Sequence, residues 1–330
     1  MKVALVAEGV ITNITEYHLG TGFKKHGLST THPYPQGQHI RGSVGYELLH
    51  VNAGLSKSFL DENAALIYFK DAIPLHADGG LLLPFVAEKF QNFKCSTCGQ
   101  VLKHPTRKGT IIQTRVDRKT GKTSAFRLEA VTRGYSYRFK AVLNMRRGED
   151  YAEEFVAVME LIEENGLKLG RRSGKGKGHF RIDRLNYRMI RLEDIRRRAR
   201  ELERELERKD RLTLHFISDF IGELTGETIL TGVKNAGRHF HPDYESYEDP
   251  FVGVKKECLP PRTVLSLHRK VTPNGGKNRI MKDMAIPAGA KVQVEFAEKP
   301  PEIFYECLAI AELRGIGAKT SFGKGEFVVV

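Results

Sequence analysis

Two glycine-rich segments recur at a constant separation along the chain, and this repeat constrains the fold more than any other feature. The first is "GRRSGKGKGHF" and the second is "GAKTSFGKGEF". Each follows a run with helical spacing of apolar residues, at 155–166 and 304–315, and leads into a β-rich run. A strand pattern precedes each helix, after Gly134 and after Gly289. The repeated unit is therefore strand, helix, glycine-rich loop and strand. The coinciding positions are Gly170, Gly176, Lys177, Gly178 and Phe180 with Gly317, Gly323, Lys324, Gly325 and Phe327.

A repeated β-α-loop-β half unit predicts an α+β fold of ferredoxin-like modules. Each copy has too few helices for a bundle and too few strands for a barrel. The chain has 330 residues, which is enough for two domains of ordinary size. We therefore expect two modules in tandem, at 1–190 and 211–330.

The stretch between the two expected modules, 191–210, is almost entirely charged. Its few apolar residues recur at helical spacing and form one narrow seam, which predicts a helix that links the modules. Asp194 and Arg198 stand four residues apart, a spacing that favours an ion pair on that helix. The apolar seam consists of Ile195, Ala199, Leu202 and Leu206.

The glycine-rich segments fit neither of the two common nucleotide-binding loops. A Walker loop needs a glycine five residues before Gly-Lys-Ser/Thr, and a dinucleotide loop precedes a helix, whereas these segments follow one. Glycines permit close approach of the backbone, and the basic side chains supply charge. We therefore expect contacts with a nucleic-acid backbone, the alternative being a solvated charged turn. The candidates are Gly170, Arg171, Arg172, Ser173, Lys175, Gly176, Lys177 and Gly178, with Lys319, Thr320 and Lys324 in the second copy.

The charge of the chain favours a polyanionic partner. Lys and Arg total 53 against 40 Asp and Glu, a formal net charge of +13. No apolar run approaches the roughly 20 residues of a membrane-spanning helix, so no membrane partner is expected. The first residues lack the pattern of a secretory signal, and four cysteines suit a reducing compartment. These observations predict a cytoplasmic protein.

A possible metal site lies in the stretch "KCSTCGQVLKH". Cys95 and Cys98 have the two-residue gap that lets both thiolates face one ion, and zinc takes four nitrogen or sulfur ligands. His104 follows six residues later, and His76 is the nearest upstream candidate for a fourth ligand. We expect a small structural zinc knuckle here. A free thiol pair and redox chemistry are the alternatives, because no second such cysteine pair exists.

A long loop after the first strand contains no acidic residue. Between residues 18 and 41 it carries four histidines, with Lys24 and Lys25 beside His26. A histidine and a lysine next to RNA could catalyse strand cleavage by acid-base and charge-stabilising work. We favour the simpler interpretation, in which these side chains line a groove for a polyanion. The four are His18, His26, His32 and His39.

Two β-rich runs surround the turn "DRKTGK" in the stretch "TIIQTRVDRKTGKTSAFRLEAV". This pattern predicts a β-hairpin over 110–131. Its tip carries Arg118, Lys119 and Lys122, so we expect a basic hairpin.

Three stretches of the sequence together resemble the backbone-subunit group of the RAMP superfamily in CRISPR effector complexes. They are "HIRGSVGYEL", "RVDRKTGKTSAFRLEAVTRGYSYRFKAVLNM" and "NGLKLGRRSGKGKGHFRI". The C-terminal "GIGAKTSFGKGEF" is similar to the glycine-rich loop of that superfamily. The resemblance covers most of 1–190 and about the last fifty residues.

The resemblance implies RNA-recognition-motif-like RAMP modules that assemble along a CRISPR RNA, with a thumb-like hairpin wedged between bases. The thumb would be the hairpin with its tip at 117–122. The phosphate-holding elements would be Arg41, Gly42 and Ser43 at a helix start, together with 170–178. Such a subunit reads the RNA backbone, while base pairing by the guide reads the target sequence. Partners implied are the CRISPR RNA, other effector subunits, copies of this chain, and the target through the guide.

The chain departs from the family pattern in two places. Members that cleave target RNA use an aspartate in the loop after the first strand, and the loop here has none. The helix-start motif is usually Pro-Gly-Ser-Ser, and Arg41 and Val44 replace its outer residues. We therefore expect a guide-binding subunit without nuclease activity. Two alternatives remain open: a metal-independent endoribonuclease that processes CRISPR RNA, and a general basic RNA-binding protein.

Overall fold

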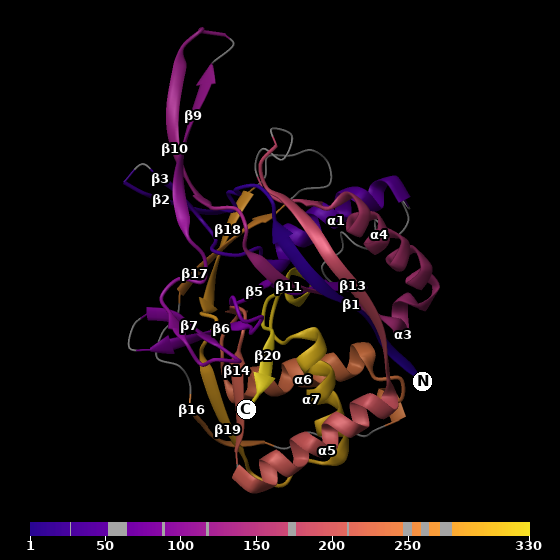
Figure 1. Cartoon of the computed structure of the whole chain (residues 1–330). Helices are drawn as coiled ribbons and strands as arrows, with labels where there is room; N and C mark the ends of the chain where they lie inside the picture. Colours follow the sequence, from indigo (N-terminus) through magenta and orange to yellow (C-terminus); the bar gives the residue numbers. More distant parts are fainter. Residues whose placement is uncertain are drawn as a thin grey trace.

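Two sheets with the same strand order form the framework of the chain (Figure 1). The structure is a computed structural model, and it describes residues 1–26, 28–51, 65–87, 90–116, 119–170, 176–209, 211–246, 253–258, 264–270 and 279–330. Helices and several antiparallel sheets make the fold mixed α+β, as expected. No helix within these residues is long and apolar enough to cross a membrane.

The N-terminal sheet contains four main strands, and two helices pack against it. Its strands follow the spatial order fourth, first, third, second, and each neighbouring pair is antiparallel. This is the order of a β-α-β-β-α-β unit. In chain order the elements are β1 (Lys2–Asn13), α1 (Gly37–Val51), β4 (Ile67–Phe69), β11 (Ser136–Asn144), α4 (Ala152–Asn165) and β13 (His179–Arg191), with short β5 (Ile73–Pro74) beside β11 and β12 (Leu167–Lys168) beside β13.

Both helices cover the same face of this sheet. The apolar residues Phe155, Val158 and Ile162 recur at helical spacing on α4 and are buried. They share one hydrophobic core with Ile40 of α1 and Leu5 of β1. The alternation of β1 therefore sends every second side chain toward these helices.

The C-terminal sheet repeats this order in full. Its neighbouring strands are again antiparallel, and read from β20 to β16 they again follow the order fourth, first, third, second. The repeat therefore extends over six elements, beyond the half unit that the sequence repeat predicts. The elements are β14 (Leu212–Phe216), α6 (Gly226–Phe240), β16 (Val254–Cys258), β19 (Lys291–Phe296), α7 (Glu302–Arg314) and β20 (Phe327–Val329).

Four glycines mark the repeat in the backbone as well as in the sequence. α4 ends at Gly166 (φ 73°) and α7 ends at Gly315 (φ 89°), and glycine tolerates this left-handed region. Gly134 and Gly289 both have φ 93° and both precede the third strand of their sheet. The predicted unit of strand, helix, glycine-rich loop and strand is confirmed in both halves.

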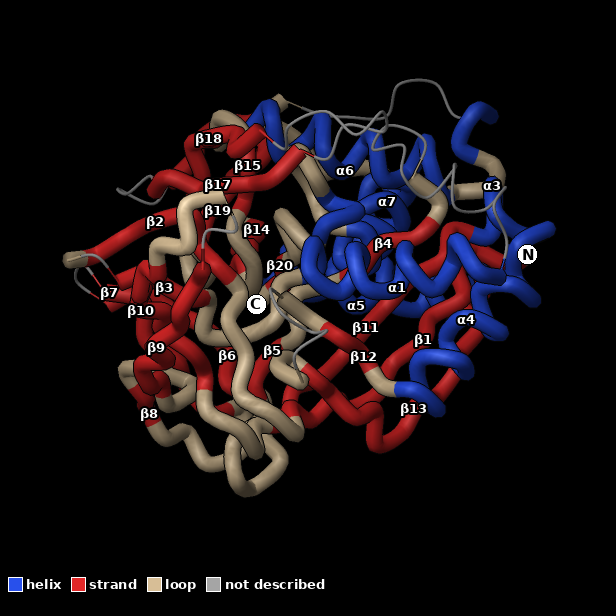
Figure 2. Tube along the Cα trace, turned by 90° about the horizontal axis from the view of Figure 1, so that it is seen from above, coloured by secondary structure: helices blue, strands red, loops and turns tan. Residues whose placement is uncertain are grey.

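Smaller sheets are inserted into this framework. Figure 2 shows their strands gathered on one side of the molecule, while most helices lie on the other. The predicted hairpin over 110–131 is confirmed, and it protrudes from the body in Figure 1. One sheet consists of β2 (Gly20–Lys25), β3 (Leu28–Thr31), β9 (Lys108–Val116) and β10 (Thr123–Val131); a second of β6 (Leu82–Ala87), β7 (Phe90–Cys95) and β8 (Val101–Leu102); a third of β15 (Phe220–Ile221), β17 (Val264–Lys270) and β18 (Arg279–Ile286).

The predicted charged helix is present as α5 (Leu192–Lys209), and its apolar seam is buried. It packs against α7 rather than standing in solvent between the halves. Arg198 does not pair with Asp194 as expected, because its guanidinium reaches Glu312 of α7 at 2.8 Å. Asp194 pairs with Arg197 instead.

The two halves share a hydrophobic core. Val6 and Val142 of the N-terminal sheet belong to the same buried cluster as the C-terminal helices. The rings of Tyr68 and Phe240 lie 5.4 Å apart at the boundary between the halves. The remaining short elements are α3 (Met145–Gly148), η1 (Glu149–Tyr151), η3 (Tyr244–Ser246) and η4 (Thr320–Phe322).

Candidate functional site

The first glycine-rich loop is closed by backbone contacts next to the end of β1. Leu169 N donates to Gly178 O at 2.8 Å, and Gly178 N donates to Glu16 O at 2.9 Å. A Cβ at Gly170 (φ +89°) would lie 2.6 Å from His18 O, and a Cβ at Gly178 would collide with the Leu169 carbonyl. Only glycine fits both positions without moving the backbone.

Lys177 pairs with Glu16 beside this closure, and both side chains remain solvent-accessible, at 41% and 36%. Gly176 (φ +75°) lies in the turn before Lys177 and has no neighbouring atom that a Cβ would meet. Among the described residues of the loop, Gly176 is exposed and Lys177 is partly exposed. The expected contacts Arg171, Arg172, Ser173 and Lys175 lie outside the described residues.

The second glycine-rich loop is closed in the same way. Ile316 N donates to Gly325 O at 3.0 Å, and Gly325 N donates to Asp219 O at 2.8 Å. Lys324 Nζ lies 3.5 Å from Asp219 Oδ2, as Lys177 lies beside Glu16 in the first loop. The two loops therefore share a backbone closure and a lysine-carboxylate pair.

The second loop, however, is covered by the N-terminal half, and this overturns two of the expected phosphate contacts. Its turn η4 packs against α1 and β4. Thr320 is 5% exposed and Lys324 is 0% exposed, so neither side chain can reach an RNA phosphate. Lys319 pairs with Asp283 at 2.7 Å and its side chain is only 16% exposed. The docking of one half on the other removes this loop from the surface.

Residues 41–43, which we expected to hold phosphates at the start of a helix, have a different position in the structure. α1 begins at Gly37, so these residues lie in its second turn. Arg41 is 4% exposed: its Nη1 donates to Ser321 Oγ at 2.6 Å, and its Cζ lies 4.1 Å from the centroid of the Phe322 ring. Arg41 therefore holds the second loop in place. Gly42 is exposed and Ser43 is half-buried, with Ser43 Oγ accepting from Lys168 N at 3.4 Å.

A cluster of buried charges fills the boundary under the second loop. Asp71 accepts a hydrogen bond from Gly37 N at 2.8 Å and lies 3.9 Å from Lys324 Nζ. Burial raises the pKa of Asp71 to about 7, although Lys324 opposes this shift. Burial alone would lower the pKa of Lys324, but Asp71 and Asp219 outweigh it and raise that pKa. Burial also lowers the pKa of His39 to about 3, so His39 is neutral at pH 7.

The sheet formed by β2, β3, β10 and β9 carries the accessible basic residues of the acid-free loop. Lys24 and Lys25 are exposed on β2, and exposed His26 (φ 48°) forms the turn that follows. The strand register places Lys25 in one row with Arg127 of β10 and Ile112 of β9, which is 69% exposed. Arg127 was not predicted from the sequence, because only the strand register brings it beside Lys25.

The tip of the hairpin adds further basic residues. Lys119 and Lys122 are exposed there. Arg118 lies outside the described residues. The described part of the tip is therefore basic and solvent-accessible, as the sequence pattern predicts.

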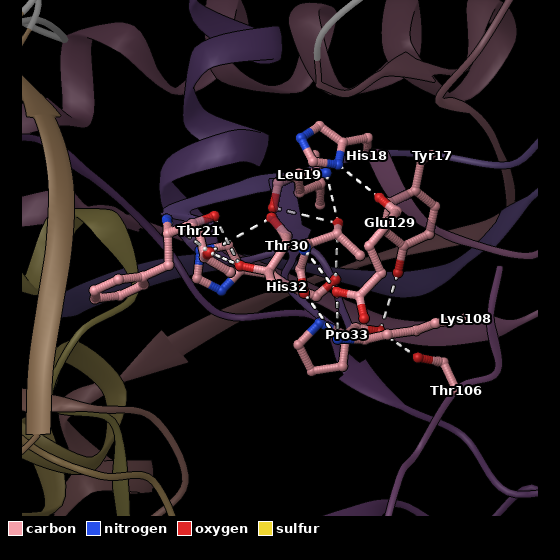
Figure 3. Close-up of polar contacts among 12 residues, drawn as sticks. Tyr17, His18, Leu19, Thr21, Thr30, His32, Pro33, Thr106, Lys108 and Glu129 are labelled. Carbon is pink, nitrogen blue, oxygen red and sulfur yellow. Dashed lines mark hydrogen bonds and ion pairs between the residues drawn. The ribbon is translucent and has the colours of Figure 1, made fainter. Parts of the chain in front are cut away.

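A polar network fixes this sheet to the body of the protein (Figure 3). Glu129 Oε2 accepts from Thr31 N at 2.9 Å and from Lys108 Nζ at 3.1 Å, which ties β10 to β3 and β9. In the buried core, the hydroxyl groups of Tyr17 and Tyr137 lie 2.8 Å apart. The base of the hairpin is therefore joined to the body of the protein by hydrogen bonds.

A possible metal-binding group lies between β5 and the sheet of β6, β7 and β8. His76, Asp78, Cys95 and Cys98 each offer one ligand atom, and these atoms lie within 4.8 Å of one another. His76 Nδ1 is 3.2 Å from Asp78 Oδ1 and 3.6 Å from Cys98 Sγ. Gly80 N donates to Asp78 Oδ1 at 2.8 Å, and this bond is the main reason that the pKa of Asp78 is held well below its usual range.

Four ligand atoms of nitrogen, oxygen and sulfur fit a tetrahedral metal ion. Three of the four expected ligands, His76, Cys95 and Cys98, are brought together. His104 is wrong: it is exposed and does not belong to the group. Asp78 takes its place, because the turn after His76 folds back against Cys95. The sequence analysis missed Asp78, and the His-x-Asp spacing upstream of the cysteine pair is the signal that could have found it.

Comparisons with known proteins give structural likeness only. No protein-family model and no curated protein sequence matches the chain. A structure of type III-B Cmr-beta bound to cognate target RNA has 14% identity and a TM-score of 0.38, over 56% of this chain and 61% of that one. A Cas6 product complex has 14% identity and a TM-score of 0.45, over 100% of both chains. Cmr-beta bound to cognate target RNA and AMPPnP has 11% identity and a TM-score of 0.46, over 87% of this chain and 86% of that one.

Proposed function

We propose that the chain is an RNA-binding subunit of a CRISPR effector ribonucleoprotein. It would hold the backbone of the guide RNA while the guide pairs with its target, and it would have no nuclease activity of its own. Its architecture would be two tandem ferredoxin-like RAMP modules, 1–190 and 211–330, linked through the helix at 191–210. The identical strand order of the two sheets supports this division.

The observation that carries the proposal is the protruding basic sheet. Lys24, Lys25 and Arg127 give it positive charge at exposed positions, which favours phosphate contacts. Phe23 and Ile112 are 44% and 69% exposed on the same sheet. Apolar side chains on a protruding ribbon can insert between bases and unstack them. The hairpin of β9 and β10 is therefore the proposed thumb.

The first glycine-rich loop would hold the RNA backbone near the base of this sheet. The exposure of Gly176 supports close approach there, with charge from Lys177. The equivalent loop of the second module would have a different task, since it is buried against α1 and β4. Only one of the two loops is thus proposed to bind RNA.

The absence of an acidic residue between 18 and 41 supports the proposed lack of target cleavage. The proposed partners are a CRISPR RNA, other effector subunits including copies of this chain, and the target bound through the guide. The proposed location of this assembly is the cytoplasm.

The proposed metal is zinc, held by His76, Asp78, Cys95 and Cys98. These residues would supply one imidazole, one carboxylate and two thiolates, and a closed set of four protein ligands is typical of structural zinc. The ion would stabilise the turn between Asp78 and the sheet of β6 to β8. It has no proposed role in chemistry on RNA.

The test of the proposed function uses two single-stranded RNAs of equal length and unrelated sequence. We expect equal affinity for both, because contacts with phosphates carry no sequence information. We also expect both RNAs to remain intact in EDTA and in Mg²⁺. A strong preference for one sequence would contradict backbone reading, and cleavage would contradict a nuclease-free subunit.

One observation favours the processing endoribonuclease as a second candidate. His26 is exposed in the turn that follows Lys24 and Lys25 of β2, and both lysines are exposed as well, so an imidazole and two ammonium groups are solvent-accessible within three consecutive residues. This grouping could donate and accept protons at a bound RNA without a metal. His32 is a poorer candidate, because its Nε2 is buried and its ring centroid lies 5.5 Å from that of His39.

A further inference from the structure

One face of the N-terminal sheet points away from α1 and α4 and is covered only in part. At one end, Val6, Val142 and Tyr68 pack into the core shared with the C-terminal half. Farther along β13, the side chains of Arg184 and Arg188 are exposed. This part of the face belongs neither to the glycine-rich loop nor to the hairpin.

The strand register arranges the uncovered part into rows across three strands. Arg184 of β13 lies opposite Val10 of β1, and Val10 lies opposite Arg138 of β11. In the next row Glu8 of β1 stands between Asn186 and Lys140, and beyond it exposed Arg188 lies opposite Val6, where the covered part of the face begins. Directly opposed residues of neighbouring strands point to the same face. Basic side chains therefore flank β1 on both sides.

The charges of this face do not cancel. Arg138 Nε lies 3.6 Å from Glu8 Oε1, and Arg181 Nε lies 2.6 Å from Asp183 Oδ1. Within the part of the chain that the structure describes, Lys140, Arg184 and Arg188 make no such ion pair. The cations are Arg138, Lys140, Arg181, Arg184 and Arg188, and the anions are Glu8 and Asp183.

The same rows carry no aromatic ring between Thr12 and Glu8 of β1 or between Ser136 and Lys140 of β11 that faces this side. Sheets of RNA-recognition motifs stack bases on aromatic side chains at the face that binds RNA. Stacking of that kind is impossible here. This face can therefore contact a nucleic acid through its basic side chains and through the hydrogen-bonding side chain of Asn186.

The position of the face connects it to the first glycine-rich loop. β13 begins at His179, directly after Gly178, so the loop leads into the strand that carries Arg181, Arg184 and Arg188. At about 3.3 Å per residue, these arginines span roughly 23 Å along β13. A strand leaving the loop would meet basic side chains along this path.

We propose that this uncovered face binds the backbone of a single-stranded RNA by charge alone, without stacking its bases. It continues the path from the first glycine-rich loop along β13 toward the C-terminal half. This inference rests on the proposed function, since it extends the RNA-binding surface of the same module. Arg184 and Arg188 are the side chains on which the binding depends.

The test compares two double variants that lose the same charge. One is Arg184→Ala with Arg188→Ala, and the control is Arg200→Ala with Arg208→Ala on the exposed side of α5. Affinity is measured for oligouridylate and for oligoadenylate of equal length over a series of salt concentrations. Urea unfolding of each variant verifies that the fold is retained, and Arg184→Lys with Arg188→Lys tests for rescue by charge.

We expect the β13 variant to bind both oligomers several-fold more weakly by equal factors, while the α5 control binds like wild type. The slope of log affinity against log salt should fall by roughly 1.4, at about 0.7 for each lost phosphate contact. The lysine variant should retain most of the binding. Equal behaviour of the β13 variant and the control would overturn the inference and leave the proposed function standing. If the wild-type protein bound neither oligomer, the proposed function and this inference would both be rejected.

Discussion

Lys324 lies beside Asp219 in the second half in the same way that Lys177 lies beside Glu16 in the first half, at equivalent points of two closed glycine loops. The environments differ: Lys324 is fully buried, whereas the Lys177 side chain is 41% exposed. One duplicated motif therefore has one copy inside the protein and one copy at its surface.

Substitution of each lysine should lower the free energy of unfolding by a different amount, because the two environments differ. Lys324→Met leaves the buried carboxylate of Asp71 and the half-buried carboxylate of Asp219 without their cation, and we expect the free energy of unfolding to fall by about 3–5 kcal/mol. Lys177→Met removes an exposed pair, so a change of at most about 1 kcal/mol is expected. Urea unfolding measures both. Similar losses in the two variants would show that the burial of Lys324 has been misjudged.

The raised pKa of Asp71 predicts a pH dependence of stability. Burial raises it to about 7 from an ordinary 3.8, so between these values the folded protein binds more protons than the unfolded chain. The contribution of Asp71 to the free energy of unfolding therefore falls as pH rises through this range, by up to about 1.4 kcal/mol per pH unit.

The control for this pH dependence is Asp71→Asn, which keeps an oxygen that can accept the Gly37 hydrogen bond but cannot ionise. The stability of wild type relative to this variant should decrease from pH 4 to pH 7 and level off above pH 8. Parallel stability curves for the two proteins would rule out the titration of Asp71 in this range.

The proposed zinc site predicts a defined pattern of zinc content. The wild-type protein should bind one equivalent of zinc, and EDTA should lower its melting temperature. Asp78→Ala and Cys98→Ser each remove one ligand atom, so we expect at least about tenfold weaker binding. His104→Ala is the matched control, because His104 lies outside the group and should leave zinc content unchanged. Loss of zinc in the His104 variant alone would reverse the assignment.

Cleavage assays distinguish the nuclease-free subunit from the processing enzyme. We expect the purified protein to leave CRISPR repeat RNA intact in EDTA, and His26→Ala to bind that RNA nearly as well as wild type. His32→Ala is a control for a histidine whose Nε2 is buried. Metal-independent cleavage that disappears in the His26 variant would establish the endoribonuclease instead.

Local patterns in the sequence predicted the elements that depend on local physics. Helical spacing of Phe155, Val158 and Ile162 predicted α4, and glycine at 166 predicted its end, because both signals act within a few residues. The hairpin around 117–122 follows from alternation and a turn for the same reason. Both elements can therefore be predicted without knowledge of contacts between distant segments.

Contacts between distant segments could not be predicted from such local patterns. Lys324 and Arg41 look like surface cations in the sequence, and both are buried because the second loop docks on α1. Asp78 was missed as a ligand because the turn that brings it to Cys95 is defined by tertiary packing. Similar sequence motifs can therefore differ in role when one copy is covered by a distant segment of the chain.

The most direct test of backbone binding is the salt dependence of RNA affinity in a variant of the protruding basic sheet. The variant replaces four exposed lysines with alanine, and the control replaces four exposed arginines of α5. We predict that the variant lowers the slope of log affinity against log salt by roughly 2.8, at about 0.7 per lost contact, equally for unrelated RNA sequences. An unchanged slope, or a change confined to one sequence, would contradict the account. The four lysines are Lys24, Lys25, Lys119 and Lys122, and the four arginines are Arg197, Arg200, Arg204 and Arg208.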